Sequence, residues 1–402
     1  MWDVIVIGGG ISGSLTALEL ATNHRVLLIE SAKELLPDSC TSRNQCFKLH
    51  TGMHYFGDLE TAKACLIRSI AFARAFPTCI VGGLNLNAPF RRGRHFVMKN
   101  SFVTSEEALS VAASLKELYL QLITTDPENQ VFGLPDNFYR ILTPHEYDYL
   151  SSDIPYYDEQ GCCHPTGIAL GIETAESLVD FEALRRNIRQ KISSCSNITV
   201  LVDTIVTDIL PEQERQGYLI QVTQKNKEHS IIKTRLIVNC AWQHIELLSK
   251  NIPQKRSTEE PGVNRIKVTL LVKLPEALHA LNTCLFSTGP YCSITVLENG
   301  EAILASERFT NIGFYPVTEK ISPALEEEIR IKTSLQTEAG KLFAQQILED
   351  CSAYFVPALQ ELMKQSIIKA FHVGVVKHTD LTSNYTRRSI YEEKSVIHSR
   401  LD

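Results

Sequence analysis

Three glycines near the amino terminus have the spacing of a phosphate-binding turn. Gly8, Gly10 and Gly13 occupy the three defining places of the pattern GxGxxG, and Ile11 and Ser12 stand between the second place and the third. The first glycine permits a tight turn, the second lets the backbone approach a pyrophosphate, and the third lets a helix pack closely against a strand. The pyrophosphate then meets the positive end of that helix and its free N–H groups. These five residues are therefore candidate contacts of a dinucleotide.

An acidic residue follows the glycine turn at the distance that a dinucleotide requires. Glu30 lies at the end of the next apolar stretch, 20 residues after Gly10. A carboxylate at this place can accept hydrogen bonds from the hydroxyl groups of an adenosine ribose. The same charge would repel the 2′-phosphate of NADP, so that cofactor is disfavoured. The alternative is a glycine turn in a Rossmann-like fold that binds no nucleotide.

The segments around these residues have the pattern of a strand–helix–strand unit. Residues 3–7 form an apolar run that ends in glycines, residues 11–22 carry apolar groups at helical spacing, and residues 25–30 are again apolar. A strand, a helix and a second strand within about 30 residues make a βαβ unit. The glycine turn is thus expected to lie between a buried parallel strand and a helix.

The rest of the chain predicts a mixed α/β protein with a second sheet. We expect helices over residues 57–76, 105–124, 321–349 and 356–366, a further helix within residues 174–195, and strands over 198–210, 217–224 and 234–241. From Val263 onward the pattern alternates, and Glu298, Asn299 and Gly300 stand between two β-rich runs as the turn of a hairpin. The second lobe is therefore expected to be an antiparallel sheet, interwoven with the first.

Composition excludes several classes of protein. The 402 residues are 44% hydrophobic and 21% charged, as in an ordinary globular enzyme. A net charge of −6 disfavours a nucleic-acid partner, and no apolar run reaches the roughly 18 residues of a transmembrane segment. The amino terminus has no pattern of a secretory signal. The eleven cysteines are scattered, which favours reduced thiols in a cytoplasmic protein without a metal site.

Beyond Glu30 the sequence resembles the D-amino-acid-oxidase-like (DAO) superfamily of FAD-dependent oxidoreductases. The stretch from Ser39 to Tyr55 is similar to the family's second flavin-contacting segment, and its Asn44, His50 and Gly52 match the branch of L-2-hydroxyglutarate and glycerol-3-phosphate dehydrogenases best. Further likeness lies in residues 164–170, 179–184, 204–206 and 236–241. The resemblance covers most of the first 245 residues and the remainder more loosely.

The resemblance implies FAD as cofactor and a Rossmann-like FAD-binding domain interwoven with an antiparallel β-sheet substrate domain. It places the FAD-binding domain in residues 1–80 and 150–250 with part of 350–402, and the substrate domain in 81–149 and 251–350. Beside the glycine turn and Glu30, the cofactor contacts that it implies are Ser42, Asn44, Ile205, Val206, Ala241 and Trp242. Trp242 stands where the family usually has glycine, so either the local backbone differs or the indole stacks beside the nucleotide. The family's glycine-containing closing segment is not found near the carboxyl end, and weak FAD binding is expected for that reason.

Histidines and an arginine are the candidate catalytic residues. In hydroxyacid-oxidising relatives a histidine of the second flavin-contacting segment can take the hydroxyl proton, a role that the resemblance gives to His50 or His54. A covalent histidyl–flavin link at His50 and a purely structural loop histidine are alternatives. The substrate's anionic group needs a cation, for which Arg308 is the main candidate. Other candidates are Arg43, Arg387 and Arg388. The run from Arg91 to His95 is interpreted as a solvated turn.

The expected activity is the oxidation of a small anionic molecule, a 2-hydroxy acid or a polyol phosphate, by hydride transfer to the flavin. Electrons would then pass to oxygen or a quinone. One alternative is an amine or amino-acid oxidase, which shares the fold and needs no histidine base. Another is a flavin-fold protein that serves as a binding module without turnover.

Overall fold

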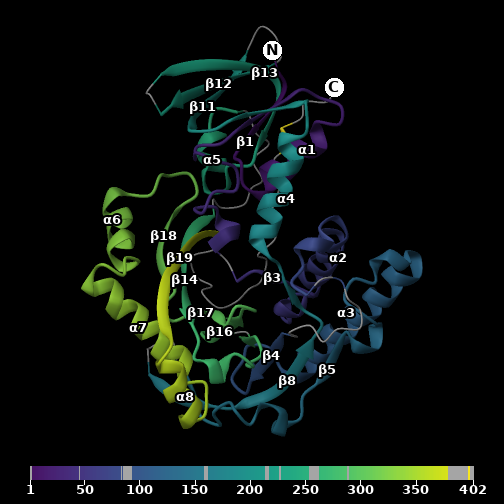
Figure 1. Ribbon diagram of the computed structural model, residues 1–402, viewed down its shortest axis with the longest axis vertical. Coiled ribbons are helices and arrows are strands. Elements are labelled where there is room, and N and C mark those ends of the chain that lie inside the picture. Colours follow the sequence, from purple (N-terminus) through teal and green to yellow (C-terminus); the bar gives the residue numbers. More distant parts are fainter. Residues whose placement is uncertain are drawn as a thin grey trace.

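The chain has two lobes, each built around a β-sheet (Figure 1). The structure is a computed structural model, and it describes residues 2–44, 46–82, 84, 93–157, 162–212, 217–225, 228–252, 262–287, 289–378 and 397–398. The candidates Arg387 and Arg388 lie outside the described residues. Within the part of the chain that is described, no helix combines the length and the apolar character that crossing a membrane requires.

The first sheet contains the predicted βαβ unit. Strand β1 (Trp2–Ile7) lies between β2 (Val26–Ile29) and β13 (His229–Asn239) and is parallel to both, and β10 (Ile198–Leu201) extends the sheet beyond β2. Helix α1 (Ile11–Leu20) connects β1 to β2. The strand–helix–strand prediction for residues 3–30 is confirmed, and the apolar stretch 234–241 contains the end of the central strand β13.

An antiparallel extension lies on the other side of β13. Strands β12 (Gly217–Gln224) and β11 (Thr204–Glu212) follow in that order, and the backbone of β20 (Ile397–His398) pairs with β13 near its end. The stretch 198–210 thus holds β10 and most of β11, which lie at opposite ends of the strand order, and Asp203 between them has a φ of 50°.

Both faces of β1 are covered, which explains its uninterrupted apolar sequence. On one face Val4 and Val6 belong to a buried cluster with Leu184 and Ile188 of helix α4 (Phe181–Ser193). On the other face Ile5 and Ile7 pack with residues of β11, β12 and the short helix α5 (Ile245–Leu248). Packing on both faces holds the glycine turn at the carboxyl end of β1 in a rigid frame.

The second sheet is mostly antiparallel, as expected. Its strands run in the order β18, β14, β17, β16, β15, β4, β8 and β5, and β19 also pairs with β14. Their bounds are β4 Arg94–Met98, β5 Tyr139–Ile141, β8 Ile168–Thr174, β14 Val263–Lys273, β15 Cys284–Ser287, β16 Cys292–Val296, β17 Glu301–Ser306, β18 Asn311–Pro316 and β19 Ile367–His378. Among the described strand pairs of this second sheet, only β4–β15 is parallel. The hairpin predicted at 298–300 joins β16 and β17, and Gly300 has a φ of 74° in its turn.

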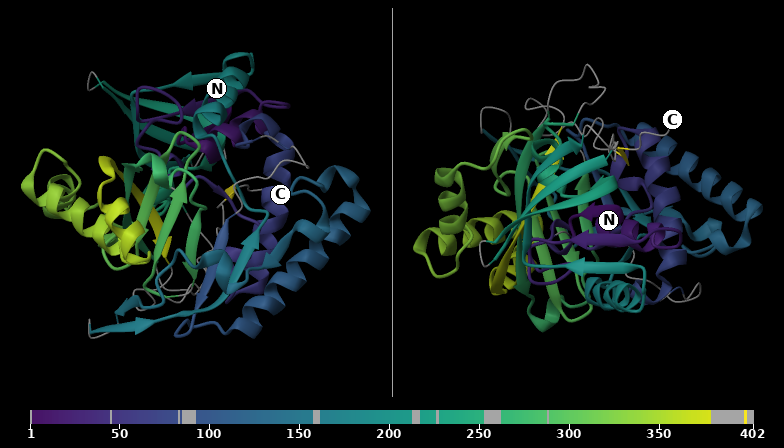
Figure 2. Two further views of the ribbon diagram at one scale, coloured as in Figure 1. Left: turned by 60° about the horizontal axis from the view of Figure 1, so that its bottom comes forward. Right: turned by 90° about the horizontal axis from the view of Figure 1, so that it is seen from above.

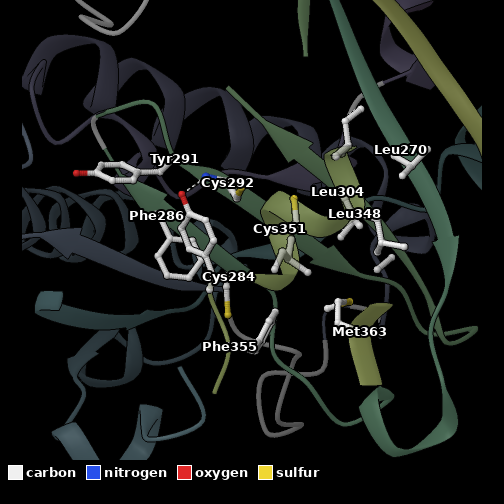
Figure 3. Close-up of a cluster of buried hydrophobic side chains, with 14 of the residues drawn as sticks. Leu270, Cys284, Phe286, Tyr291, Cys292, Leu304, Leu348, Cys351, Phe355 and Met363 are labelled. Carbon is white, nitrogen blue, oxygen red and sulfur yellow. Dashed lines mark hydrogen bonds between the residues drawn. The ribbon is translucent and has the colours of Figure 1, made fainter. Parts of the chain in front are cut away.

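Helices cover the two faces of this sheet at different places (Figure 2). Helices α6 (Pro323–Lys332), α7 (Glu338–Ser352) and α8 (Pro357–Lys364) lie on one side, where side chains of the strands and helices form a large buried cluster (Figure 3). Helices α2 (Leu59–Ala75) and α3 (Ser105–Thr125) pack near β4 and β8 instead. These five helices occupy the ranges that the helical periodicity predicts.

Two short strands lie between the lobes and bring the flavin-contacting segment close to the second sheet. Strand β3 (Lys48–Leu49) pairs with β9 (Ser177–Leu178), which follows β8 directly along the chain. Strands β6 (Ile154–Tyr157) and β7 (Cys163–Thr166) form a separate hairpin. Because β8 belongs to the second sheet, residues 150–250 contribute to both lobes, and the domain boundaries given above remain a proposal.

Candidate active and cofactor site

Two of the three motif glycines are required by close backbone contacts. A Cβ atom on Gly8 would lie 2.6 Å from the carbonyl oxygen of Cys240, and Gly8 has a φ of 99°. A Cβ atom on Gly13 would lie 1.8 Å from the carbonyl oxygen of Gly8. The first and third glycines therefore let β1, α1 and the end of β13 approach one another, as the motif requires.

The second glycine has a different environment. A Cβ atom on Gly10 would meet no atom within 4 Å, and Gly10 has an ordinary φ of −69°. Gly10 is the N-cap of α1, whose first turn has no side-chain cap and no acidic residue. The first N–H groups of a helix, here those near Ile11 and Ser12, have no partner within the helix. Open space therefore adjoins the positive end of α1, where a phosphate is stabilised.

Glu30 supports the turn from the end of β2. Its buried carboxylate accepts hydrogen bonds from the backbone N–H groups of Gly9 at 2.6 Å and Ala32 at 2.8 Å. Each carboxylate oxygen can accept more than one hydrogen bond, so capacity for a ribose hydroxyl remains. The N–H of Thr204 donates to the backbone oxygen of Glu30. This bond brings the start of β11, with Ile205 exposed and Val206 buried, beside Glu30.

The segment after β13 closes the turn from the opposite side. The N–H of Cys240 donates to the backbone oxygen of Ile7, and the N–H of Ala241 donates to the side chain of Asn239. Trp242 has a φ of 48°, in the left-handed region that glycine enters without strain. Its indole Nε1 donates to the backbone oxygen of Val375 at 2.7 Å. The indole thus joins the first lobe to β19. For this residue the sequence offered two alternatives, a different local backbone or an indole stacked beside the nucleotide.

The side chains of Asn44 and Arg43 hold the segment that resembles the family's flavin-contacting stretch. The amide of Asn44 is buried and donates to the backbone oxygens of Asp38 and Cys40, whereas Ser42 is exposed. Arg43 lies 3.2 Å from Glu182 and stacks over the ring of Phe47. Asn44 therefore shapes the loop through its amide nitrogen.

Gly52 is the residue of this segment that tolerates substitution least. It has a φ of 97°, and a Cβ atom would lie 2.3 Å from the backbone oxygen of Ala62. Gly52→Ala is expected to lower the free energy of unfolding by at least about 1–3 kcal/mol, as measured by urea unfolding. Gly57→Ala is the matched control, because the nearest side-chain atom there is Val103 Cγ2 at 3.4 Å. Equal stability of the two variants would contradict this reading of the loop.

His372 of β19 makes the stability of the protein depend on pH. Its buried ring packs against Phe47, and burial, with a smaller contribution from the charge of Arg43, lowers the pKa of His372 to about 4. The unfolded chain takes up this proton near the ordinary value of about 6.5. Between those values the unfolded state binds more protons, so stability falls as the pH drops through this window.

The pH effect of His372 can be isolated by substitution. His372→Gln is expected to remove about 2 kcal/mol from the loss of unfolding free energy between about pH 7 and pH 5. Urea unfolding at both pH values measures the difference. His145→Gln, at an exposed position, should leave the loss as it is in the wild type. If His372→Gln behaves like that control, His372 carries a proton in the folded protein.

His50, Glu176 and His95 form a hydrogen-bonded chain between the lobes. His50 Nδ1 lies 2.6 Å from Glu176 Oε1, and His95 Nε2 lies 3.3 Å from Glu176 Oε2. The side chain of Glu176 is 2% exposed and that of His95 0%, whereas His50 is partly exposed. His50 lies in the loop after β3, Glu176 in the connection between β8 and β9, and His95 in β4. A carboxylate thus orients the imidazole of His50.

The protonation of this chain follows from its burial and charges. Burial alone would raise the pKa of Glu176, but electrostatic attraction to the rings of His50 and His95 and the hydrogen bonds from both rings hold it well below its usual range. Burial lowers the pKa of His95, and the attraction of Glu176 only partly opposes this. We therefore describe Glu176 as ionised and His95 as neutral at neutral pH. Among the described residues no group of three or more His, Cys, Asp or Glu side chains could hold a metal ion.

Of the other predicted catalytic residues, His54 lies beside His50, whereas Arg308 contacts other residues. The rings of His54 and His50 are neighbours, with centroids 4.8 Å apart. Arg308 stacks over Tyr157 at 3.6 Å and lies 3.7 Å from Asp350 of α7. These contacts of Arg308 belong to the part of the second lobe that α7 covers, and they do not include His50 or His54.

Sequence reasoning missed Glu176 and misinterpreted His95. The run from Arg91 to His95 was expected to be a solvated turn, but His95 is fully buried and Arg94 pairs with Glu173. That interpretation is wrong for Arg94 and His95 because they begin β4, a strand inside the second sheet; Arg91 and Arg92 lie outside the described residues. No local pattern marks Glu176, since its role arises only from contacts far apart in the sequence.

Comparison with protein families identifies the chain. The family model of FAD dependent oxidoreductases (DAO) matches residues 3–375. A comparison with curated protein sequences gives no match.

Solved structures with the same fold are flavoenzymes of several substrate classes. Glycine oxidase from Geobacillus kaustophilus is similar with a TM-score of 0.55 and 15% identity, over 94% of this chain and 83% of that chain. L-proline dehydrogenase from P. horikoshii gives 0.55 and 16%, over 94% and 82%. Dithionite-reduced L-α-glycerophosphate oxidase from Mycoplasma pneumoniae, with FAD bound, gives 0.55 and 18%, over 96% and 85%. At these identities the likeness shows the fold.

The residues of the glycine turn fit FAD. Open space adjoins Gly10 at the uncapped end of α1, where the pyrophosphate belongs, and Glu30 retains capacity for a ribose hydroxyl. The expected cofactor therefore agrees with both the geometry and the family match. Because the family model matches residues 3–375, the chain belongs to the DAO family of FAD-dependent oxidoreductases.

Proposed function

We propose that this enzyme oxidises a small hydroxylated anion, a 2-hydroxy acid or a polyol phosphate, and that His50 accepts the hydroxyl proton. The observation that carries the proposal is the 2.6 Å contact between His50 Nδ1 and the ionised, buried carboxylate of Glu176. An oriented histidine base is useful for an alcohol, whereas the amine oxidation of the same fold needs none. The family acts on several classes of substrate. This contact is therefore what favours a hydroxylated anion over an amine.

The contact supports Nε2 of His50 as the nitrogen that takes the proton. The ionised carboxylate of Glu176 accepts only, so Nδ1 carries the hydrogen and Nε2 keeps the lone pair of the neutral ring. Nε2 takes the hydroxyl proton while the substrate's C–H hydrogen leaves with its electron pair, and the alcohol becomes a carbonyl. FAD, when bound, supplies the acceptor for that hydride. The proton on His50 then forms an ion pair with Glu176.

Arg308 remains the proposed partner of the substrate's anionic group. Its side chain is 38% exposed, and its distance of 3.7 Å from Asp350 is too long for a hydrogen bond. The guanidinium therefore keeps donors for a carboxylate or a phosphate. If Arg308 binds the anion, Arg308→Ala raises KM and leaves the rate at saturation largely unchanged. An unchanged KM would remove Arg308 from the site.

Anaerobic stopped-flow reduction of the bound flavin tests the proposed activity. The panel comprises L-2-hydroxy acids, glycerol 3-phosphate and amino acids. We expect hydroxylated anions to reduce the flavin and amino acids to leave it oxidised. Reduction by amino acids alone would establish an amine oxidase instead, and the absence of reduction by every compound would favour a binding module. Mixing the reduced enzyme with oxygen or a quinone then identifies the electron acceptor.

A further inference from the structure

Contacts with side chains and backbone on several sides hold the carboxylate of Glu176 in one orientation. His50 and His95 occupy one oxygen each, at 2.6 and 3.3 Å. On the remaining side the backbone of Gly93 approaches so closely that a Cβ atom there would lie 2.8 Å from Oε2. Thr174 links the same parts, because its hydroxyl donates to the backbone oxygen of Gly93 and accepts from the N–H of Glu176. The carboxylate is thus held from three segments of the chain.

We propose that Glu176 and His95 are positioning residues for His50. Ionised Glu176 keeps the hydrogen of the His50 ring on Nδ1, and neutral His95 holds Glu176 in the orientation that this requires. The consequence for catalysis rests on the proposed function, whereas the state of the three side chains does not. Neither residue touches the reacting atoms in this proposal.

The environment of His95 keeps that ring neutral. It is completely buried, and the positive charges of Lys48 and His50 oppose a further one. Its Nε2 faces the carboxylate, and its Nδ1 has no hydrogen-bond partner among the described residues. A second proton would therefore place a hydrogen on Nδ1 without an acceptor, which is costly in a buried position. His95 consequently donates one hydrogen bond through Nε2 and takes no charge.

In this arrangement His50 is the one member of the three that takes up a proton. Glu176 contributes one negative charge, and proton uptake by His50 balances it. The groups that face the pair from neighbouring elements are Lys48, His54, the thiol of Cys65, which donates to the backbone oxygen of His50, and His95. Removal of the charge of Glu176 makes proton uptake by His50 less favourable. The rate of a reaction that needs the neutral ring should then stay high to lower pH, while the weaker base lowers its maximum.

Histidine side-chain NMR of the FAD-loaded enzyme tests the assigned states without any substrate. Long-range nitrogen–hydrogen correlation spectra distinguish the two neutral ring forms and the charged ring. We expect hydrogen on Nδ1 of His50 and on Nε2 of His95, with His95 neutral at neutral pH. In Glu176→Gln the preference of His50 for Nδ1 should be reduced. Hydrogen on Nε2 of His50 in the wild type, or a charged His95, would overturn the proposal.

The pH dependence of flavin reduction separates positioning from simple structural support. For Glu176→Gln we expect a loss of about 10-fold up to the full 10²–10⁴-fold that a general base contributes, together with a shift of the acid limb to lower pH. His95→Gln can donate from nearly the place of Nε2 and should retain most of the rate, whereas His95→Leu should not. Glu117→Gln, at an exposed position of α3, is the matched control.

The two experiments fail in distinguishable ways. If no hydroxylated anion reduces the flavin, the proposed function is wrong, and the spectra still decide the states of His50 and His95. If hydroxylated anions reduce the flavin but Glu176→Gln leaves the acid limb in place, or if His95→Gln is as slow as His95→Leu, the positioning role is wrong. Equal rates and profiles for Glu176→Gln and Glu117→Gln would also overturn it.

Discussion

Gly10→Val is expected to abolish FAD binding while the protein remains folded. The new side chain would enter the open space at the end of α1 that the pyrophosphate needs. It would meet no protein atom within 4 Å of its Cβ, and the φ of −69° at this position suits valine. The absorbance of bound flavin and the circular dichroism of the purified variant measure the two properties separately. Stoichiometric flavin in a folded Gly10→Val protein would place the cofactor elsewhere.

Gly13→Val provides the contrast that makes this result specific. Its Cβ would overlap the backbone oxygen of Gly8 at 1.8 Å, so α1 could not pack against β1. This variant is expected to lose both the flavin and much of its folded structure. If both variants lose the fold, the absence of flavin in Gly10→Val says nothing of the pyrophosphate site. The circular dichroism therefore decides how the flavin measurement is interpreted.

His50→Asn is expected to slow the reduction of the flavin by about 10²–10⁴-fold, the usual contribution of a general base. The amide of asparagine can still donate to Glu176, so the buried carboxylate keeps a partner, but it cannot accept the hydroxyl proton. Flavin binding should persist because Gly10 and Glu30 are unchanged. Anaerobic stopped-flow measurements with saturating substrate give the rate.

The comparison with His50→Ala shows how much of the effect is proton transfer. Alanine leaves the carboxylate of Glu176 without its shortest hydrogen bond, so this variant should also be less stable than His50→Asn. His145→Gln, at an exposed position, should reduce its flavin at the wild-type rate. A His50→Asn enzyme as fast as the wild type would exclude His50 as the base and favour amine oxidation.

The parts of this structure that sequence reasoning predicted are those with a local cause. The βαβ unit has the apolar runs and glycine spacing of its elements within 30 residues, and the hairpin at 298–300 has a turn signal between two β-rich runs. Such patterns depend on neighbours in the sequence and can be recognised without tertiary contacts.

The hydrogen-bonded chain of His50, Glu176 and His95 depends on pairings that no local pattern encodes. Glu176 reaches His50 across 126 residues and His95 across 81, through the pairing of β4 with β8 and of β3 with β9. A buried carboxylate in a short connection between two strands has no sequence signature. The conformation of Trp242 also involves a distant contact. Its backbone is left-handed, and its indole donates to the backbone oxygen of Val375 on a strand 133 residues later.

The pairing of β1 with β13 has a consequence for the synthesis of this protein. Trp2 and Thr234, which face each other in the sheet, are separated by 232 residues. A ribosome that adds about 5–20 residues per second needs tens of seconds to reach β13. During that time the apolar edge of β1 lacks its partner, and an open strand edge invites pairing with other chains. This edge of the nascent first lobe therefore stays unpaired until more than half of the polypeptide has been made.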